Sequence, residues 1–565
     1  MQIIYIRNFL SNFSKINAVR GEWSSDRAPR LFATSILLII CLPLIYLLIL
    51  CFQHFESIFT SSVRHVLSSA IFDTLCLVMG VSIFTSLIGV GLAYLTTFFN
   101  FIGVRFLTIT SVLPLSIPTY LSAYIYVDIE RSSTVILRPS VIPWFWDNFN
   151  LLLPDIRSLP GAIFIFSIVL FPYVFISTRI ALLGQGSALI TVARSLGKTP
   201  NEIFFSIILP LCYPAISAGI LLVIMETVSD FGASEYLGVR TLGYTIYTTW
   251  LIRNDMSSTI QLCLLLILLI FIFSLFLNYI VKRFRTGENR KIYGSVSYFE
   301  ISFYKRYLLL FFGSCPFIIG FVIPFLYLID QQMFHLQVQS DLAALLNILG
   351  DSILISIFSA FLIVIISIIL IYPYRLFSDG FCKLILAGAS YGYAVPGIIL
   401  SVLILGLFGF LDEISNRFFI WVLNIDTNLI FAGTGVSLFF AYVVKFTSVG
   451  LSSIREGYDK ISVDLDIASR SLGRNRLVSF ILVPTWINLP TLIASFFLLF
   501  IDIMKELPMT LILRPLGVDT LSTEIYESAS LGQFERASLE SICLLTISTI
   551  TVIIFTHRQL GISKP

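Results

Sequence analysis

The chain has 565 residues, of which 57% are hydrophobic and 12% are charged, and its mean hydropathy is +0.93. A soluble globular protein carries about twice that charged fraction, so the composition excludes a soluble fold. The net charge of +3 at pH 7 is too small to indicate any particular partner.

Taken from the start, residues 1–30 are polar and basic, and the first apolar run follows at 31–52. No short apolar region with a small-residue cleavage site precedes this run, so we expect an uncleaved anchor. Crossing a ~30 Å hydrocarbon core takes about 20 helical residues, and a backbone in lipid satisfies its own hydrogen bonds best as a helix. The sequence therefore predicts an all-α polytopic membrane protein with 12 spans, at about 31–52, 67–98, 105–128, 159–183, 211–234, 258–281, 307–328, 346–372, 384–410, 429–452, 485–511 and 537–556.

A hydrophilic linker divides these spans into two sets of six. Its basic residues predict a cytoplasmic position, and nothing aromatic or repetitive in it suggests that the protein binds nucleic acid. The expected organisation is an N-terminal segment at 1–30, a first half at 31–281, the linker at 282–306, a second half at 307–556 and a tail at 557–565.

Orientation is predicted from the distribution of lysine and arginine. If the N-terminus is cytoplasmic, most of the 36 basic residues fall in segments on the cytoplasmic side. Short cytoplasmic loops are enriched in Lys and Arg. We therefore expect a multi-pass protein with both termini in the cytoplasm.

Two short polar segments, each containing a glycine, lie between long apolar runs. Glycine permits a sharp turn, and a proline at the head of the next run suits the first turn of a helix. Each segment therefore predicts a helix, a sharp bend and a second helix on the cytoplasmic side. The first segment contains Ala193, Arg194, Ser195, Leu196, Gly197 and then Pro210, and the second contains Ala468, Ser469, Arg470, Ser471, Leu472, Gly473 and then Pro484.

The two halves are a sequence repeat. Residues 237–247 match residues 516–526 at seven of eleven positions. Self-similarity at a fixed offset indicates a duplicated structural unit. Because each unit has six spans, both have the same orientation, as in transporters whose substrate path lies at the interface of parallel repeats. Three separated pairs of landmarks share a nearly constant offset in number: Gly197 with Gly473, Pro118 with Pro396, and Val239 with Val518.

At the two glycine segments the chain resembles the inner-membrane permeases of type I ABC importers. Their hallmark, the EAA loop, reads Glu-Ala-Ala, three residues, Gly, nine residues and Ile-x-Leu-Pro. The first segment, near 184–210, has that spacing between Gly197 and Ile207-Ile208-Leu209-Pro210, although Thr191-Val192-Ala193 replaces Glu-Ala-Ala. The second, near 453–484, has Ile467-Ala468-Ser469 at its start, and Pro484 comes two residues early. The resemblance implies a MetI-like fold in which both loops couple to an ATPase.

Further segments are similar to ferric iron permeases, which are also two fused six-span halves. Residues 225–233 resemble the segment that follows the first EAA loop in that family, and residues 505–515 resemble its counterpart after the second loop. Permeases for thiamine, phosphonates and polyamines share parts of the pattern. The resemblance implies a ferric iron importer, with one of those substrates as the alternative.

Five ionisable residues lie within or at the end of two predicted spans. Such residues are costly in lipid unless they are paired or face water, so a functional position is the default hypothesis. The candidate translocation path consists of Glu226, Asp230, Asp502, Lys505 and Glu506. An internal ion pair between Lys505 and Asp502, three residues apart on one helical face, is an equally weighted alternative.

No cofactor or catalytic centre is predicted in this chain. Gly197-Lys198-Thr199 lacks the earlier glycine of a phosphate-binding loop, because position 192 is valine. The four histidines have no metal-ligand spacing, and most of the eight cysteines lie in apolar runs. We therefore expect ATP and Mg²⁺ to bind a separate subunit. The expected partners are two copies of an ABC ATPase, a periplasmic or lipid-anchored binding protein, and membrane lipid.

Two functions of other classes are less consistent with the sequence. A transporter driven by an ion gradient also has repeats and intramembrane charges, but it does not need two matching cytoplasmic glycine loops. A membrane enzyme or respiratory subunit needs a catalytic cluster or histidine pairs for haem, and the sequence contains neither. The prediction is a fused double permease in the bacterial inner membrane.

Overall fold

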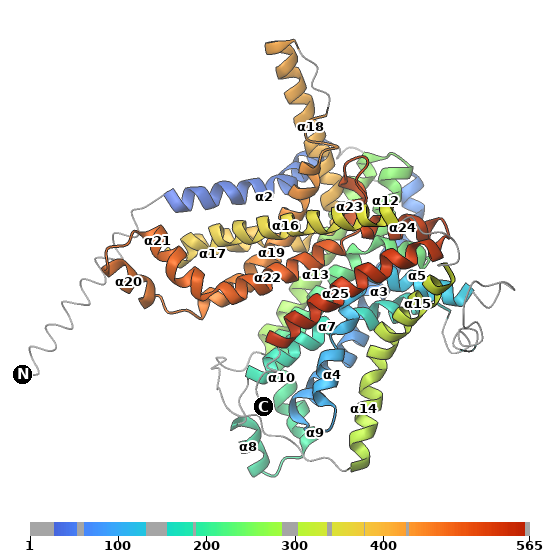
Figure 1. The fold of residues 1–565 in the computed structure, drawn as a ribbon, viewed down its shortest axis with the longest axis vertical. Helices are drawn as coiled ribbons and strands as arrows, with labels where there is room; N and C mark the ends of the chain where they lie inside the picture. Colours follow the sequence, from blue (N-terminus) through green and yellow to red (C-terminus); the bar gives the residue numbers. More distant parts are fainter. Residues whose placement is uncertain are drawn as a thin grey trace, which may run out of the picture.

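The computed structural model describes residues 28–53, 61–131, 148, 155–184, 188–284, 303–335, 342–377, 379–424 and 429–559. All regular elements in these ranges are helices, as predicted (Figure 1). Ten of them are long and apolar enough to cross a membrane, and two pairs of shorter helices pass the same test together. With each pair counted as one span, the total is 12. Most of the predicted segment 1–30, most of the linker 282–306 and residues 560–565 of the tail lie outside the described residues.

The first half of the chain begins with α2 and ends with α13. Its elements are α2 (Ala28–Gln53), α3 (Ser61–Phe98), α4 (Val104–Thr110), η1 (Leu113–Ser116), α5 (Thr119–Arg131), α7 (Leu159–Gly184), α8 (Ala188–Ser195), α9 (Pro200–Ile203), η3 (Phe204–Ile208), α10 (Leu209–Ser229), α11 (Phe231–Tyr236), α12 (Leu242–Tyr247), η4 (Thr248–Ile252) and α13 (Met256–Phe284).

The second half begins with α14 and ends with α25. Its elements are α14 (Phe303–Phe317), η5 (Ile318–Val322), α15 (Ile323–His335), α16 (Leu342–Phe377), α17 (Gly380–Ala389), η6 (Gly392–Ala394), α18 (Gly397–Leu423), α19 (Gly435–Asp459), α20 (Asp464–Ser471), α21 (Arg476–Phe480), η7 (Ile481–Thr485), α22 (Leu489–Met504), α23 (Pro508–Leu513), α24 (Leu521–Ser530) and α25 (Phe534–Gln559).

Four predicted spans are interrupted and are not continuous helices. The span expected at 105–128 consists of α4, η1 and α5 and bends by 88°, and the span expected at 384–410 is broken between α17 and α18. The cause is the same in both halves, because a residue before proline is driven out of helical conformation. Ile117 precedes Pro118 with ψ 125°, and Val395 precedes Pro396 with ψ 123°. The other two breaks, after α10 and after α22, fall at charged residues.

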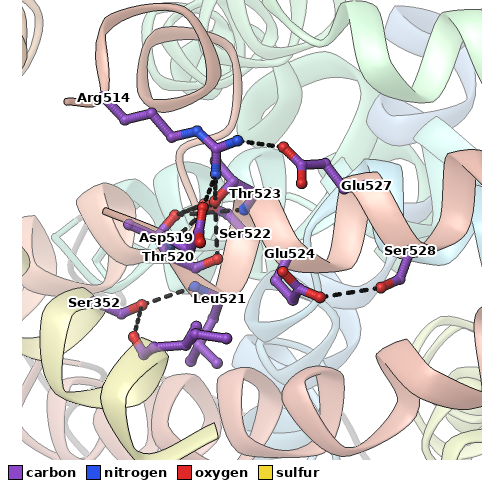
Figure 2. Close-up of polar contacts among 11 residues, drawn as sticks. Ser352, Arg514, Asp519, Thr520, Leu521, Ser522, Thr523, Glu524, Glu527 and Ser528 are labelled. Atoms are coloured by element: carbon purple, nitrogen blue, oxygen red, sulfur yellow. Dashed lines mark hydrogen bonds and ion pairs between the residues drawn. The ribbon is translucent and has the colours of Figure 1, made fainter. Parts of the chain in front are cut away.

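The two halves share equivalent internal contacts. In the first half the backbone nitrogen of Leu242 donates to Oγ1 of Thr74 at 2.8 Å, and in the second half that of Leu521 donates to Oγ of Ser352 at 2.8 Å (Figure 2). Ser352 follows Thr74 by 278 residues and Leu521 follows Leu242 by 279, which agrees with the nearly constant offset of the sequence repeat. The sequence repeat therefore corresponds to a structural repeat. In each half this hydrogen bond joins the segment after the broken span to the long second span of the same half.

The matched segments 237–247 and 516–526 have the same turn. Gly238 and Gly517 have positive φ angles of 73° and 83°, a conformation that glycine adopts without steric cost. Thr241 and Thr520 then cap α12 and α24 through their side chains, since a threonine oxygen at this position accepts a free backbone N–H of the first turn. The matching residues are thus those that the turn and the cap require.

The second copy of this segment carries an additional ion-pair network. Arg514 pairs with both Asp519 and Glu527, and its guanidinium also donates to Thr523 (Figure 2). These contacts link the end of α23 to α24, so ion pairs stabilise the turn between these two helices in the second half.

The first span of each half packs on the opposite half. α2 contacts α16, α17 and α18, and α14, η5 and α15 together contact α4, α5 and α7. The hydroxyl of Tyr391 donates to the carbonyl of Ile40, and that of Tyr126 donates to the carbonyl of Ile319. At the start of α2, Arg30 pairs with Asp379 at 2.9 Å. The two halves therefore interlock through exchanged first spans.

Candidate functional site

The first glycine segment has the predicted form of helix, bend and helix. At the end of α8 the backbone nitrogen of Gly197 donates to the carbonyl of Arg194 at 2.9 Å, and Gly197 has φ +79°. Thr199 then starts α9 in a reciprocal cap, because its backbone nitrogen donates to Glu202 at 2.8 Å and its hydroxyl accepts from the Glu202 nitrogen. Such a capping box satisfies two free backbone donors. The bend is thus fixed by local hydrogen bonds.

The second glycine segment repeats this geometry with different residues. The nitrogen of Gly473 donates to the carbonyl of Arg470 at 2.9 Å, and Gly473 has φ +86°. Asn475 caps α21 by accepting from the nitrogen of Val478 at 2.8 Å. In Figure 1, α8 and α9 lie at the bottom and α20 and α21 at the left, and all four are distant from α12 and α24 at the upper right.

Each segment presents one apolar side chain at its tip. Leu196 is 75% exposed and Leu472 is 84% exposed, and the two leucines occupy equivalent places directly before the glycine. An exposed leucine at the same place in both copies suits contact with a partner. Among the other predicted loop residues, the buried ones are Ala193 and Ser469, and the exposed ones are Arg194, Ser195, Ala468 and Ser471.

The two prolines occupy different positions, as the shorter spacing in the second segment suggests. Pro210 lies in the first turn of α10, which continues the direction of η3. Pro484 lies inside η7, and a bend of 77° separates Arg476–Thr485 from Leu489–Met504. The second segment therefore joins its span through a sharper corner.

An arginine that the sequence did not single out braces the second segment. Arg375 of α16 pairs with Asp466 of α20 at 2.7 Å and donates to the carbonyl of Tyr458 at 2.8 Å. Burial raises the pKa of the Asp466 carboxyl, and the Arg375 guanidinium partly offsets this effect. The brace connects α20 to the ends of α16 and α19.

All five residues of the candidate translocation path line one cavity between the halves. The cavity has a volume of about 80 Å³, which is room for a few water molecules, since each needs roughly 10–15 Å³. All five lie at helix ends or breaks. Asp230 lies between α10 and α11, and Lys505 and Glu506 lie between α22 and α23, while Glu226 is in the last turn of α10 and Asp502 in that of α22. The full lining is Leu115, Ile117, Pro118, Thr119, Tyr120, Val169, Leu170, Tyr173, Glu226, Ser229, Asp230, Lys445, Phe446, Asp502, Lys505, Glu506, Leu507 and Pro508.

The two acids of the first half are held by neutral groups. Glu226 accepts from the hydroxyl of Tyr393, which belongs to the second half. Asp230 accepts from the hydroxyl of Thr119 and from the backbone nitrogen of Ala233 at 2.9 Å, which makes it the cap of α11. These contacts hold the carboxylates in place but supply no opposite charge.

The two acids of the second half are held by lysines. Nζ of Lys445 lies 3.0 Å from Oε1 of Glu506, and the side chains of this pair are 8% and 4% exposed. Nζ of Lys505 lies 3.8 Å from Oδ1 of Asp502 and donates to the carbonyl of Leu115 at 3.0 Å. The predicted Lys505–Asp502 pair therefore exists within the cavity, so the pairing and path hypotheses describe the same residues.

Lys445 and Tyr393 were missed in the sequence analysis. Lys445 is a single lysine in the middle of an apolar span, a signal that marks a functional candidate by itself. Tyr393 has no such signal, because a tyrosine near a span end is common at membrane interfaces. Among the described residues, no group of three or more His, Cys, Asp or Glu side chains could hold a metal ion.

Comparison with known proteins shows that this chain is similar to membrane transport permeases. Residues 85–286 match the family described as binding-protein-dependent transport system inner membrane component. The match covers most of the first half of the chain, which is therefore similar to transport permeases.

Three relatives differ in how much of the chain they cover. The Fe(3+)-transport system permease protein FbpB 2 of Haemophilus influenzae is 24% identical over 541 residues, which is 93% of this chain and 98% of the relative. The molybdenum transport system permease protein ModB of Escherichia coli K12 is 27% identical over 36% of this chain and 88% of its own length. The spermidine/putrescine transport system permease protein PotB of H. influenzae is 32% identical over 19% of this chain and 39% of its own length.

Proposed function

We propose that this chain is the membrane subunit of an ABC importer that carries ferric iron into the cytoplasm. The observation that carries the proposal is the end-to-end similarity to an Fe(3+)-transport permease that spans both halves. The molybdenum permease matches little more than one third of the chain. The similarity to the iron relative therefore extends over both halves of this chain.

The charge of the cavity supports a cation as cargo. Four carboxylates and two lysines line it, so their formal sum is −2. A cavity of this sign lowers the energy of a cation and raises that of an oxyanion such as molybdate. Carboxylate oxygens are also suitable ligands for hard cations. Polyamines are cations too, and the match to a spermidine/putrescine permease makes them the second candidate.

In the proposed mechanism, ATP hydrolysis on a partner moves the two glycine segments. Two copies of an ABC ATPase dock on the segments around Gly197 and Gly473, with Leu196 and Leu472 as apolar anchors. With both termini cytoplasmic, these segments face the cytoplasm and α12 and α24 face the binding protein outside. The loaded binding protein drives the switch through its differential affinity for the two states.

The test is ATPase activity in proteoliposomes that contain the permease, its ATPase and the candidate binding protein, with and without bound ferric iron. We expect stimulation by the iron-loaded protein, and loss of stimulation in Gly197→Asp and Gly473→Asp with the complex still assembled. The control variant is Gly184→Asp, in which no described atom lies within 4 Å of the added Cβ. If spermidine, thiamine or a phosphonate stimulates the ATPase through its binding protein and iron does not, that compound is the substrate and the iron proposal is wrong. Absence of any co-purifying ATPase would refute the coupling role of the segments.

A further inference from the structure

The repeat places carboxylates at equivalent positions of the cavity. Asp230 accepts from the backbone nitrogen of Ala233, and Glu506 accepts in the same way from that of Met509. These two acids differ in number by 276, as Gly197 and Gly473 do, and the same offset pairs Glu226 with Asp502. Both lysines of the cavity belong to the second half. The first half therefore brings carboxylates without lysine partners, and the second half brings ammonium groups to the same space.

The two lysines of the cavity are held differently. Lys445 forms a close pair with Glu506 at 3.0 Å, and the pair is almost fully buried. Lys505 lies 3.8 Å from Asp502, and the side chains of this pair are 12% and 19% exposed. A charge-assisted hydrogen bond is normally about 2.7–2.9 Å long. Lys505 is thus the more loosely held ammonium group, and its close contact is a backbone carbonyl of the opposite half.

A neutral oxygen in the same cavity is buried without a hydrogen-bond partner. Tyr120 lines the cavity and is 3% exposed, and among the described residues no group hydrogen-bonds to its hydroxyl. A buried hydroxyl of this kind needs an explanation. Because Tyr120 lines the same cavity as Glu226 and Asp230, a ligand bound there would give its hydroxyl the partner that it lacks.

We propose that the ammonium group of Lys505 takes the place of the cationic cargo while the cavity is empty. Its ammonium group offsets part of the negative charge of the cavity when no cation is present, and a hard multivalent cation held by Glu226, Asp230 and the Tyr120 hydroxyl displaces it. The inference rests on the proposed function only in that the cargo is a cation. It assigns Lys505 the role of keeping cation binding weak, because the cargo must replace a charge already present.

Two physical arguments support this role. Several carboxylates that share one cavity repel each other, so an empty site without a cation is unstable unless some of them take up protons. A transport site must also bind its cargo weakly enough to release it. A lysine on the opposite half meets both needs, since it supplies charge when the site is empty and competes with the cargo when the site is filled.

Terbium is a suitable probe, since Tb³⁺ is a hard trivalent cation whose luminescence is sensitised by nearby tyrosine. Tyr120 and Tyr173 line the cavity. In the purified permease–ATPase complex, we expect tyrosine-sensitised Tb³⁺ luminescence that is lost in Glu226→Gln and Asp230→Asn. In Lys505→Gln we expect the apparent Kd for Tb³⁺ to fall by about tenfold or more, because a nearby like charge is removed. Lys505→Arg keeps the charge and should keep the wild-type Kd.

Matched controls and outcomes separate this inference from the choice of iron as cargo. Lys383→Gln and Glu413→Gln, which alter exposed residues away from the cavity, should leave the Kd unchanged. An unchanged or weaker Kd in Lys505→Gln, or equal tightening in Lys505→Arg, would overturn the inference. So would a Tb³⁺ signal that does not depend on Glu226 and Asp230. If Tb³⁺ binds as expected but iron-loaded binding protein gives no ATPase response, the inference holds and the iron proposal fails.

Discussion

Gly397 shows how closely single residues of the two halves meet at the cavity. Its nitrogen donates to Oγ of Ser229 at 3.0 Å across the interface between the halves. A Cβ added at this position would lie 2.8 Å from Oε1 of Glu506 and 3.2 Å from Nζ of Lys445. Only a residue without a side chain leaves room for both the buried ion pair and the contact with the first half.

We therefore expect Gly397→Ala to destabilise the protein by about 1–3 kcal/mol, the usual cost of overpacking. The measurement is thermal unfolding of the purified protein in detergent. Gly409→Ala, in the same helix and with no described atom within 4 Å of the added Cβ, is the matched control and should be neutral or slightly stabilising. Equal effects of the two substitutions would contradict the packing argument.

The Lys445–Glu506 pair makes a second prediction at the residue scale. Removing one partner of a buried pair leaves an uncompensated charge, which costs about 3–5 kcal/mol. Lys445→Met should therefore destabilise the protein strongly, and adding Glu506→Gln should recover part of the loss. Glu506 also accepts from the nitrogen of Met509 at 2.9 Å, and a glutamine oxygen retains that cap. Additive losses in the double-mutant cycle would show that the two groups do not interact.

Among the elements, the broken spans place the charged residues at the cavity. The breaks before Pro118 and Pro396 follow from the known restriction on a residue that precedes proline, so they were predictable in principle. The break at Asp230 was not, because its carboxylate caps α11 only once the chain has turned there. The charged residues that line the cavity stand out in the sequence because charge is rare in an apolar span, whereas Tyr393 and Thr119 carry no comparable signal.

In the described part of the first half, the end of α3 carries no arginine at the place where α16 carries Arg375. The position equivalent to Arg375 falls near Thr97, whose hydroxyl accepts from Arg179 at 3.3 Å. The first segment therefore lacks an arginine from the long second span at that place.

Arg375→Met should accordingly impair coupling more than assembly of the membrane domain. Loss of the guanidinium leaves Asp466 without its ion pair and frees the carbonyl of Tyr458. We expect transport per ATP hydrolysed to fall several-fold, measured in proteoliposomes as the ratio of uptake to phosphate release. Arg417→Met removes an exposed arginine of α18 that pairs along its own helix and should leave the ratio unchanged. A normal ratio in Arg375→Met would mean that the brace is dispensable.

For the whole molecule, the number of spans, the parallel repeat and the two bends followed from run lengths, residue offsets and glycine positions. Those features depend on local pattern and are visible in one sequence. The exchange of first spans is not, because nothing in α2 alone indicates that its partners lie in the other half of the chain. The Lys505–Leu115 contact was hidden for the same reason, since it joins the two halves.

The exchange predicts that the halves depend on each other for stability. A chain that begins at residue 61, with α2 absent, should lose stability mainly in its second half, because Tyr391 and Asp379 lose their partners on α2. Limited proteolysis in detergent should then cut within 379–424 at a lower protease concentration than in the full chain. Co-expression of residues 1–60 as a separate segment should restore protection. Preferential cleavage in the first half would contradict this view.

The exchanged first span also sets an order of events during synthesis. α2 ends at Gln53 and its partner α16 begins at Leu342, so the ribosome makes the rest of the first half and the linker between them. At about 5–20 residues per second, α2 waits roughly 15–60 s in lipid before the surface that receives it exists. α14, by contrast, meets a first half that has already been made. The first span to be made, α2, is therefore among the last to reach its final position. A translational pause in the linker would lengthen the time for which α2 is exposed to other membrane proteins.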